Sequence, residues 1–436
     1  MGHLAMKDSY AGLRSRLDKN PVGAPDTKVM YDLLRIVFTE EEARIGAQMP
    51  LQMAGLAEIG RRTGIAPETL KSRLEAMADK GLVFDFEING KMMYMLAPTI
   101  VGFFEFSMMR RRDDIDQKRL AGLVHDVLLG DSSFASQFQN SEASPFRVRV
   151  HESAIADGTF TEVLDYERAT RMIETAGKWS VGLCHCRHVA HHRGEDCQKF
   201  SMETCLSLGT GAEWTARHGL ARDIEKSEAL DLLARAHDAG LVYTGDNVQH
   251  RPTFLCLCCS CCCGVLNSFK KFGPVDPTFS SNFQATIDPA SCTGCGKCAK
   301  ACPVGVIDQF ESPHPVGGRT FKKLSRVDES VCIGCGVCHG ACRFNALSMK
   351  PRAKRRITPE TVVKRLLIHA VDNGKLHTAL IDDTQGFGLL AANRLVGAIL
   401  HLPPAKQLLA RQQLKSRFVD WLLAGAKKRK MAGVDL

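Results

Sequence analysis

Two copies of one cysteine pattern lie between residues 292 and 342, and they constrain the fold of this chain most strongly. The first copy spaces its cysteines by two, two and three residues and is followed by Pro303. The second copy has the same spacing and is followed by Arg343. The eight positions are Cys292, Cys295, Cys298, Cys302, Cys332, Cys335, Cys338 and Cys342. Eight cysteines at matched spacing do not arise by chance, and clustered thiolates favour a soft metal.

Glycines inside both motifs support a metal-binding loop. The runs Cys292-Thr-Gly-Cys-Gly-Lys-Cys and Cys332-Ile-Gly-Cys-Gly-Val-Cys let the backbone curve tightly and direct its N–H groups at sulfur. Bacterial ferredoxins use this spacing for [4Fe–4S] clusters. Residues 284–350 resemble a bacterial 2[4Fe–4S] ferredoxin, with Ile287-Asp288 and Val327-Asp328 at the ends of its duplicated leading strands.

The resemblance implies two [4Fe–4S] clusters, each held by three cysteines of one motif and the last cysteine of the other. One ligand set would be Cys292, Cys295, Cys298 and Cys342. The other would be Cys332, Cys335, Cys338 and Cys302. The segment between the motifs, residues 303–331, is long, and we expect an extra loop at Ser312–Gly318.

Ten further cysteines lie outside the ferredoxin-like segment, in two sequence groups. The first group is Cys184, Cys186, Cys197 and Cys205, and the second is Cys256, Cys258, Cys259, Cys261, Cys262 and Cys263. Six thiols in eight residues cannot all face one core, because successive side chains point in different directions. We therefore expect the groups to meet and to bind one or two further [4Fe–4S] clusters, with structural zinc as the alternative. Of His188, His191 and His192, we expect at least two in a polar surface loop.

Composition and length place the chain among globular proteins of several domains. With 436 residues, 44% hydrophobic and 24% charged, it suits two to four domains with their own cores. The clustered cysteines and the lack of a signal peptide favour metal binding in a reducing cytoplasm over disulfides. The apolar stretch Gly386–Leu400 is interrupted by Asn393 and Arg394, so we expect no transmembrane segment.

Residues 27–97 resemble a winged-helix domain of the MarR type. Thr39 and Glu42 form a capping box, a second helix is expected near 53–62, and a third from Pro67 to Gly81. Strands 83–88 and 91–96 then flank Asn89-Gly90, which is a strong hairpin signal.

The charge on this domain does not favour DNA binding. A DNA-binding face needs an excess of positive charge to displace counterions from phosphates. Here the basic and acidic side chains of the third helix and the hairpin nearly balance; they are Lys71, Arg73, Lys80 and Lys91 against Glu68, Glu75, Asp79, Asp85 and Glu87. Nucleic-acid binding is therefore not expected, and the domain is interpreted as a docking module for protein.

The predicted fold class is α+β, a mainly helical multidomain protein with a winged-helix N-terminal domain and an inserted dicluster ferredoxin-like domain. The expected divisions are an arm (1–26), the winged helix (27–97), a helical connector (98–178), a cysteine-rich domain (179–273), the ferredoxin-like domain (274–350) and a basic helical region (351–436). The net charge of +9 is concentrated in Lys350–Arg356 and Lys427–Lys430, which leaves contact with an acidic partner or a membrane surface open.

These features predict an iron–sulfur electron-transfer protein or subunit that carries low-potential electrons through two [4Fe–4S] clusters. Its partners would be a reductase and an acceptor oxidoreductase, and no glycine-rich dinucleotide fingerprint indicates hydride chemistry. One alternative is an oxidoreductase with an unusual catalytic cluster at Cys256–Cys263. Another is a redox-sensing winged-helix regulator. Whether the chain is itself an enzyme stays open at this stage.

Overall fold

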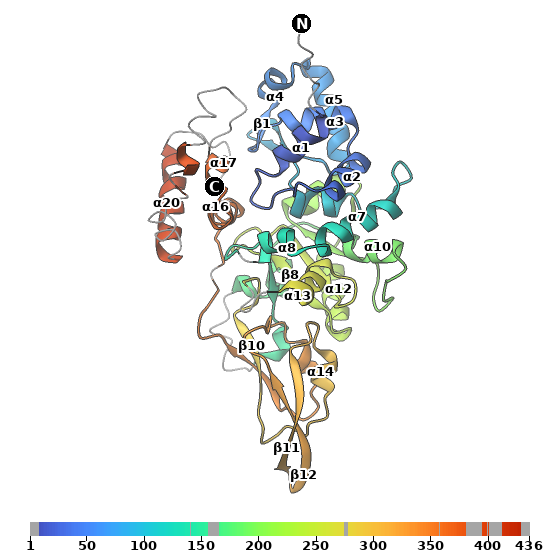
Figure 1. The fold of residues 1–436 in the computed structure, drawn as a ribbon, viewed down its shortest axis with the longest axis vertical. Coiled ribbons are helices and arrows are strands. Elements are labelled where there is room, and N and C mark those ends of the chain that lie inside the picture. The colour runs from blue at the N-terminus through green and yellow to red at the C-terminus, as the bar shows by residue number, and fades with distance from the viewer. Residues whose placement is uncertain are drawn as a thin grey trace. The chain divides into compact units, whose positions relative to one another are not determined.

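The computed structural model contains both helices and strands and separates into two compact units (Figure 1). It describes residues 8–139, 141–155, 165–273, 278–356, 358–380, 395–398, 400 and 412–428. Unit 1 comprises Met1–Ser141, Trp214–Leu220 and Thr361–Leu436. Unit 2 comprises Glu142–Glu213 and Ala221–Glu360, and it contains all eighteen cysteines.

Unit 1 begins with five helices and a small antiparallel sheet. The helices are α1 (Ser9–Leu17), α2 (Lys28–Val37), α3 (Glu40–Gln48), α4 (Leu56–Thr63) and α5 (Pro67–Asp79). The strands are β1 (Ala54–Gly55), β2 (Val83–Ile88) and β3 (Lys91–Leu96), in the order β1-β3-β2. Buried leucines and methionines of these helices, such as Leu33, Leu70 and Leu74, form the core.

The local predictions for this segment are confirmed element by element. The Thr39 hydroxyl accepts from the Glu42 N–H, while the Glu42 carboxylate accepts from the Thr39 N–H. Asn89 and Gly90 have φ of 52° and 74°, which is the two-residue turn that the Asn-Gly signal predicts. The winged-helix interpretation of the whole segment stays a prediction.

The other described elements of unit 1 are helices. They are η1 (Thr99–Phe103), α6 (Phe104–Phe106), α7 (Gln117–Leu129), α8 (Ser132–Gln139), α16 (Val362–Asp372), α17 (Leu376–Leu380) and α20 (Gln412–Lys428). Lys364 of α16 pairs with Asp420 of α20 at 2.8 Å. Among the described residues, no helix combines the length and the apolar character that a membrane span requires. Most of Gly386–Leu400 and Arg429-Lys430 lie outside the described residues.

A buried network of hydrogen bonds surrounds Asp85 of β2 in unit 1. The indole N–H of Trp214 donates to Asp85 Oδ1 (3.0 Å), and Arg217 and His218 lie 2.7 and 2.8 Å from the same oxygen. The other ring nitrogen of His218 lies 2.7 Å from Asp79. Burial acts to lower the pKa of His218, but hydrogen bonds and the charges of the two carboxylates outweigh it, and the pKa is raised.

We expect His218→Gln to destabilise unit 1 more at pH 6 than at pH 9. Because the folded-state pKa of His218 is raised, its charge stabilises the fold fully below the unfolded pKa of about 6.5. That stabilisation is lost as the pH rises through the folded-state pKa. The loss at pH 6 should be roughly 1–3 kcal/mol, the cost of a buried hydrogen bond to a charged group.

The measurement is hydrogen–deuterium exchange of peptides from β2, with variant and wild type compared at each pH. His125→Gln on α7 is the matched control, since His125 is partly exposed and next to Asp126. An equal effect of His218→Gln at both pH values would contradict the charged pair.

Unit 2 is built on a six-stranded antiparallel sheet that the sequence did not predict. Its strands are β4 (Phe146–Arg149), β5 (Trp179–Leu183), β6 (Glu203–Leu208), β7 (Ala221–Ile224), β8 (Val242–Asp246) and β9 (Phe254–Cys258), in the order β4-β8-β9-β6-β5-β7. The expected connector 98–178 is thus helical only in part, because it contains β4. The sequence of residues 227–245 predicts an amphipathic helix that ends at Gly240, and the structure confirms it as α12 (Lys226–Asp238), with β8 after it.

Helices and turns between the strands complete this part of unit 2. They are η2 (Glu152–Ala154), η4 (Asp165–Glu167), α9 (Ala169–Glu174), α10 (His185–His192), α11 (Thr210–Arg217, of which Trp214–Arg217 belongs to unit 1) and α13 (Gly264–Phe272). Leu255 and Leu257 of β9 are buried in one core with Leu206 of β6 and Leu233 of α12. Side chains alternate along a strand, so Cys256 and Cys258 point to the other side of β9.

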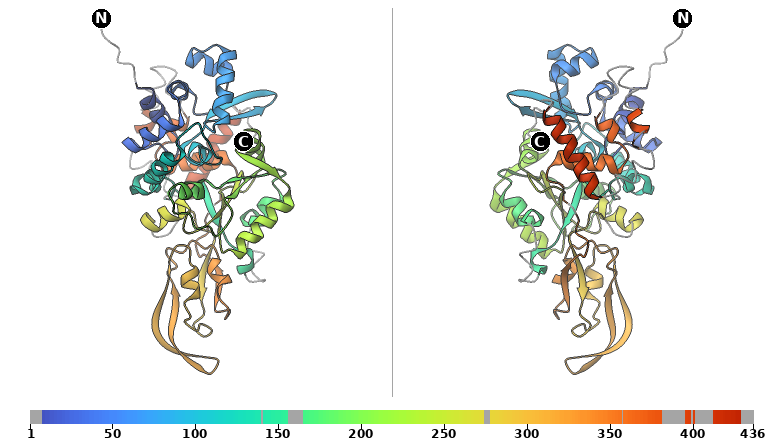
Figure 2. Two further views of the ribbon diagram at one scale, coloured as in Figure 1. Left: turned by 90° about the vertical axis from the view of Figure 1, so that its right-hand side faces the viewer. Right: turned by 90° about the vertical axis from the view of Figure 1, so that its left-hand side faces the viewer.

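The ferredoxin-like segment of unit 2 consists of two short helices and two antiparallel strand pairs. Its elements are β10 (Phe283–Ile287), α14 (Lys297–Ala301), β11 (Ile307–Val316), β12 (Arg319–Val327), α15 (Val337–Gly340) and β13 (Leu347–Pro351). Strand β10 pairs with β13, and β11 pairs with β12 in a long hairpin that both views of Figure 2 show as a curved ribbon.

The expected loop at Ser312–Gly318 is wrong, because these residues belong to the β11–β12 hairpin. Gly317 and Gly318, with φ of 55° and 77°, form its two-residue turn. The register shifts between Glu311 and His314, so Pro313 lies at an irregularity where no ladder hydrogen bond is needed. The prolines and glycines of this segment indicated a loop, but in the structure they belong to a hairpin of two edge strands.

Candidate metal centres

The two ferredoxin-like motifs adopt the same local structure. The N–H of Cys292 donates to the Asp288 carbonyl, and the N–H of Cys332 donates to the Asp328 carbonyl, both at 3.1 Å. Each aspartate carboxylate also accepts a backbone N–H two residues on, at 3.0 Å. The sequence repeat is therefore a structural repeat, and each strand ends in an aspartate turn that presents the first cysteine.

Glycine is required in these loops because other backbone approaches closely. Gly294 and Gly334 have φ of 62° and 69°. A Cβ at Gly334 would lie 2.1 Å from the Phe283 carbonyl oxygen, and one at Gly294 would meet the Lys323 carbonyl. The loop of Gly334 therefore contacts β10, and the loop of Gly294 contacts β12. A side chain at either glycine would force its loop away from that strand.

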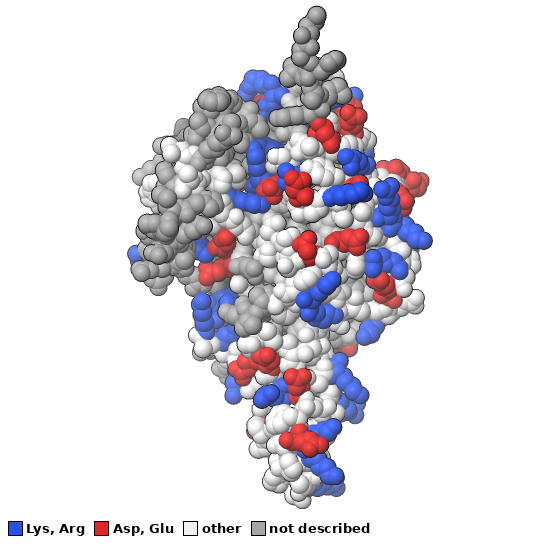
Figure 3. All heavy atoms as spheres, viewed as in Figure 1, with Lys and Arg blue, Asp and Glu red and all other residues white. Residues whose placement is uncertain are grey.

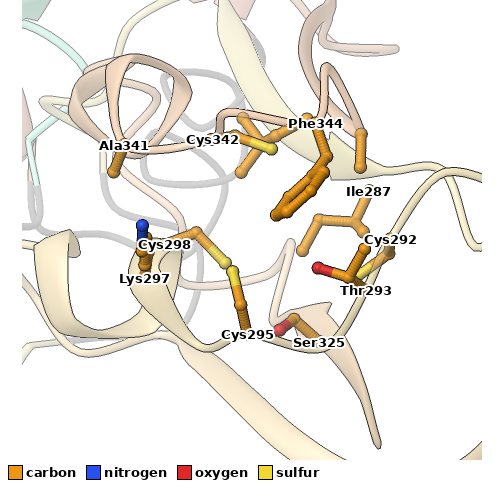
Figure 4. Close-up of a pocket in the computed structure, with 12 residues that line it drawn as sticks. Ile287, Cys292, Thr293, Cys295, Lys297, Cys298, Ser325, Ala341, Cys342 and Phe344 are labelled. Carbon is orange, nitrogen blue, oxygen red and sulfur yellow. The ribbon is translucent and has the colours of Figure 1, made fainter. Parts of the chain in front are cut away.

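The first ferredoxin-like pocket is lined by the cysteine set that the resemblance implied. Figure 4 shows Cys342 from the α15 side facing Cys295 and Cys298 across the pocket, with Cys292 at its edge. Phe344 and Ser325 also line it. The hairpin holds this loop in place, since the Gln309 amide donates to the Gly294 carbonyl at 2.5 Å.

The second pocket is lined by the other implied set and is more buried. Its cysteines are Cys302, Cys332, Cys335 and Cys338, and apolar side chains such as Ile307 and Met349 complete it. The buried guanidinium of Arg352 donates to the carbonyls of Cys332 and Ser281, which places a positive charge beside the pocket. Part of the basic run Lys350–Arg356 is therefore structural, because Arg352 is buried in the fold.

The donor chemistry of both pockets fits iron–sulfur clusters. All eighteen cysteines lie within the described residues, and none forms a disulfide. Burial raises the pKa of the Cys298, Cys335 and Cys338 thiols, so a free thiolate would be costly there. A bound metal offsets that cost because it replaces the proton on each sulfur.

The ten remaining cysteines divide into two spatial groups that cut across their order in the sequence. The four-thiol group is Cys197, Cys259, Cys261 and Cys262. The six-thiol group is Cys184, Cys186, Cys205, Cys256, Cys258 and Cys263. Each group takes cysteines from both parts of the chain, so the expectation that the two sequence groups meet is confirmed.

The pairing of β6 with β9 creates the centre of the six-thiol group. Cys205 of β6 is directly opposite Cys256 of β9, and each thiol affects the electrostatic surroundings of the other. Cys258 lies two residues further along β9, and it interacts with both Cys256 and Cys263. Cys205, Cys256 and Cys258 thus form the strand part of the six-thiol group.

The remaining thiols of the six-thiol group lie at helix starts. Cys184 is the N-cap of α10 and Cys263 is the N-cap of α13. A hydrogen bond with Cys186, opposed by burial, lowers the pKa of Cys184 to about 6, and Arg187 contributes to the shift. Contacts with Cys186 and Cys258 lower the pKa of Cys263. Such thiols are readily available as thiolate ligands.

The four-thiol group joins the loop after α10 to the turn between β9 and α13. Sγ of Cys197 lies 3.8 Å from Sγ of Cys259 and 3.8 Å from Sγ of Cys262. Cys262 and Cys261 are 3.9 Å apart, and all four sulfurs lie within 4.8 Å of one another. Burial acts to raise the pKa of Cys197, but hydrogen bonds from Cys261 and the Lys199 N–H help to lower it to about 7.

One buried arginine, Arg187, interacts with cysteines of both groups. Arg187 of α10 is 3% exposed and interacts with Cys184, Cys258 and Cys259. Its guanidinium also donates to the Ser201 carbonyl (2.8 Å) and the Thr204 hydroxyl (2.9 Å), which fix its position. A positive charge is thus fixed close to cysteines of both groups.

The histidines near these cysteines lie in helix α10, so the expected surface loop is wrong. His188 is 3% exposed, whereas His191 is exposed and His192 is partly buried. Helical spacing stacks His188 against His192, with ring centroids 4.7 Å apart. Within the described residues, the four-thiol group includes no histidine.

Comparison with known proteins assigns one segment of the chain. Residues 291–347 match the family described as 4Fe-4S dicluster domain. Neither the curated proteins nor the solved structures gave a significant match. The match covers both ferredoxin-like motifs and supports an iron–sulfur, ferredoxin-like segment that binds 4Fe–4S clusters.

We expect Gly334→Ala to remove the cluster of the second pocket. The new Cβ would collide with the Phe283 carbonyl, and the loop that carries Cys332 and Cys335 would have to open. Purified anaerobically, the variant should contain about four fewer irons and four fewer sulfides per chain than the wild type. Gly305→Ala is the matched control, because Gly305 has a similar φ of 70° but no atom within 4 Å of the methyl group that alanine would add. Full iron loading of Gly334→Ala would contradict this account.

Proposed function

We propose that this chain is an electron-transfer protein or subunit that carries low-potential electrons through two [4Fe–4S] clusters. The observation that carries the proposal is the division of eight cysteines between two pockets, each with three ligands from one motif and one from the other. Two clusters in one small fold pass electrons between them without bond rearrangement. The clusters supply the redox chemistry, and the loops, Arg352 and the apolar lining set its potential.

We further propose that the six-thiol group binds an additional iron–sulfur cluster in electronic contact with these two. The Cys335 carbonyl accepts from the His151 N–H at 2.9 Å, and the His151 ring lies 2.8 Å from the Leu241 carbonyl. The next residue, Val242, pairs with Cys258. A short hydrogen-bonded path within unit 2 therefore runs from the second pocket to the six-thiol group.

A catalytic role of the six-thiol group is a second candidate. It contains six thiols, two more than one [4Fe–4S] cluster needs, and two of them lie at helix starts with lowered pKa. An oxidoreductase that uses an unusual cluster could use such extra ligands. A change in the electron paramagnetic resonance spectrum on adding a small thiol or disulfide would favour this candidate.

Redox proteins are the partners that we propose, and the surface charge supports protein over nucleic acid. Three cations of α5 or its C-cap are already paired with carboxylates: Lys71 with Glu75, Arg73 with Glu41 and Lys80 with Glu42. On the face in Figure 3, basic and acidic side chains are interspersed. A winged-helix docking module suits these features better than a redox-sensing regulator on DNA.

Cys292→Ser and Cys332→Ser test the electron-transfer proposal, because they occupy equivalent positions in the two motifs. Each variant should lose about four irons and half of the electrons taken up by the ferredoxin-like segment in a reductive titration. The control is Ser330→Ala, which removes only a hydroxyl that donates to Asp328. Unchanged electron uptake in both cysteine variants would contradict the proposal.

A further inference from the structure

The sulfurs of the four-thiol group are spaced for a single metal ion. Four thiolates at about 2.3 Å from a tetrahedral ion lie about 3.8 Å from one another. The three sulfur–sulfur distances of 3.8, 3.8 and 3.9 Å agree with that tetrahedron. A [4Fe–4S] cluster holds its cysteine sulfurs much further apart, roughly 6 Å, because each binds a different iron.

The ferredoxin-like pockets provide an internal comparison. In the described part of the chain, the four-thiol group is the one set of three or more metal-binding side chains whose ligand atoms lie within 4.8 Å of one another. The eight cysteines of the ferredoxin-like motifs do not form such a set, although they line two pockets. The same fold thus spaces its cysteines in two ways, wide at the cluster pockets and tight at this group.

From this spacing, we propose that the four-thiol group binds one thiophilic divalent ion, Zn²⁺ or Fe²⁺, without inorganic sulfide. Four cysteine thiolates are the ligand set of structural tetrahedral sites, and both ions accept it. The six-thiol group is a separate site. The ten cysteines outside the ferredoxin-like segment therefore serve two different kinds of centre.

Backbone and charge around the four-thiol group suit a bound ion. The buried Arg187 interacts with Cys259, and its positive charge offsets the negative charge of the thiolates. The ammonium of Lys270 donates to the Ser260 carbonyl at 2.6 Å, so it lies at the same turn.

The ion would fix the turn that also serves the six-thiol group. Cys258 and Cys263 belong to the six-thiol group, and they flank the turn residues that contribute to the four-thiol group. The Cys263 N–H donates to the Cys259 carbonyl at 3.1 Å, which closes this turn. Holding Cys259, Cys261 and Cys262 on one ion therefore also fixes where Cys258 and Cys263 point.

X-ray absorption at the zinc and iron edges of the full, anaerobically purified chain tests the proposal without any substitution. We expect one zinc per chain with four sulfur neighbours at about 2.3 Å and no metal neighbour. If the ion is iron, one iron per chain should be present in excess over labile sulfide. Cobalt added during expression should replace the ion and give the absorption of a tetrahedral thiolate complex.

Cys197→Ser and Cys261→Ser give the second test, because both positions are more exposed than Cys259 and Cys262. Each should lose one metal ion per chain with no change in labile sulfide. Ser260→Ala, in the same turn but not a ligand, should retain the ion. Loss of about four irons and four sulfides would identify a [4Fe–4S] cluster and overturn the proposal, and so would unchanged metal content. Failure of the electron-transfer proposal would instead appear as low sulfide with this ion retained.

Discussion

The antiparallel pairing of β6 with β9 is the interaction on which the cysteine chemistry of unit 2 depends. It places Cys205 opposite Cys256, so two thiols from distant parts of the chain share one side of the sheet. Leucines on the other side bury that strand in the core and fix its register, because a shift by one residue would exchange the two faces. The position of the thiols is thus set by hydrophobic burial and does not require a metal to define it.

The ferredoxin-like segment could be predicted from spacing because its ligands follow one another locally. Three cysteines of each motif lie on one short loop, and glycines at fixed positions dictate how that loop curves. The match to the 4Fe-4S dicluster domain covers the same residues. What spacing did not reveal is the β11–β12 hairpin, since Pro313, Pro315, Gly317 and Gly318 have the composition of an irregular loop. Only pairing with β12 distinguishes a proline-containing edge strand from a loop.

Metal binding by the other ten cysteines is a prediction that the sequence supports, but their division into two spatial groups could not be predicted from it. The direction of each thiol depends on whether its residue lies in a strand or in a turn. Cys256 and Cys258 alternate with buried leucines in β9, whereas Cys259 begins a turn and points elsewhere. The six-stranded sheet behind this arrangement is assembled from short strands that are far apart in sequence. Patterns within single segments therefore predicted α12 well and the sheet not at all.

The positions of the buried arginines also could not be predicted from sequence patterns. Arg352 belongs to a basic run for which the sequence left contact with an acidic partner or a membrane surface open. Arg187 follows a histidine and a cysteine, and that pattern did not predict its role. In the structure each guanidinium lies beside cysteine loops and donates to backbone carbonyls. Burying such a charge is costly unless negative charge is nearby. Thiolates that bind metal retain negative charge, so both arginines are better accommodated with the metal centres formed.

The two proposed kinds of centre make different physical demands on the protein. A cluster that gains and loses electrons needs surroundings that change little when its charge changes, which apolar pockets and fixed N–H groups provide. A single tetrahedral ion with four thiolates has no open position for substrate and serves best to hold chain segments together. The turn between β9 and α13 meets both demands, because its inner residues contribute to the four-thiol group and its ends contribute to the six-thiol group. Rigidity at the first group would thereby limit movement of the ligands at the second during electron transfer.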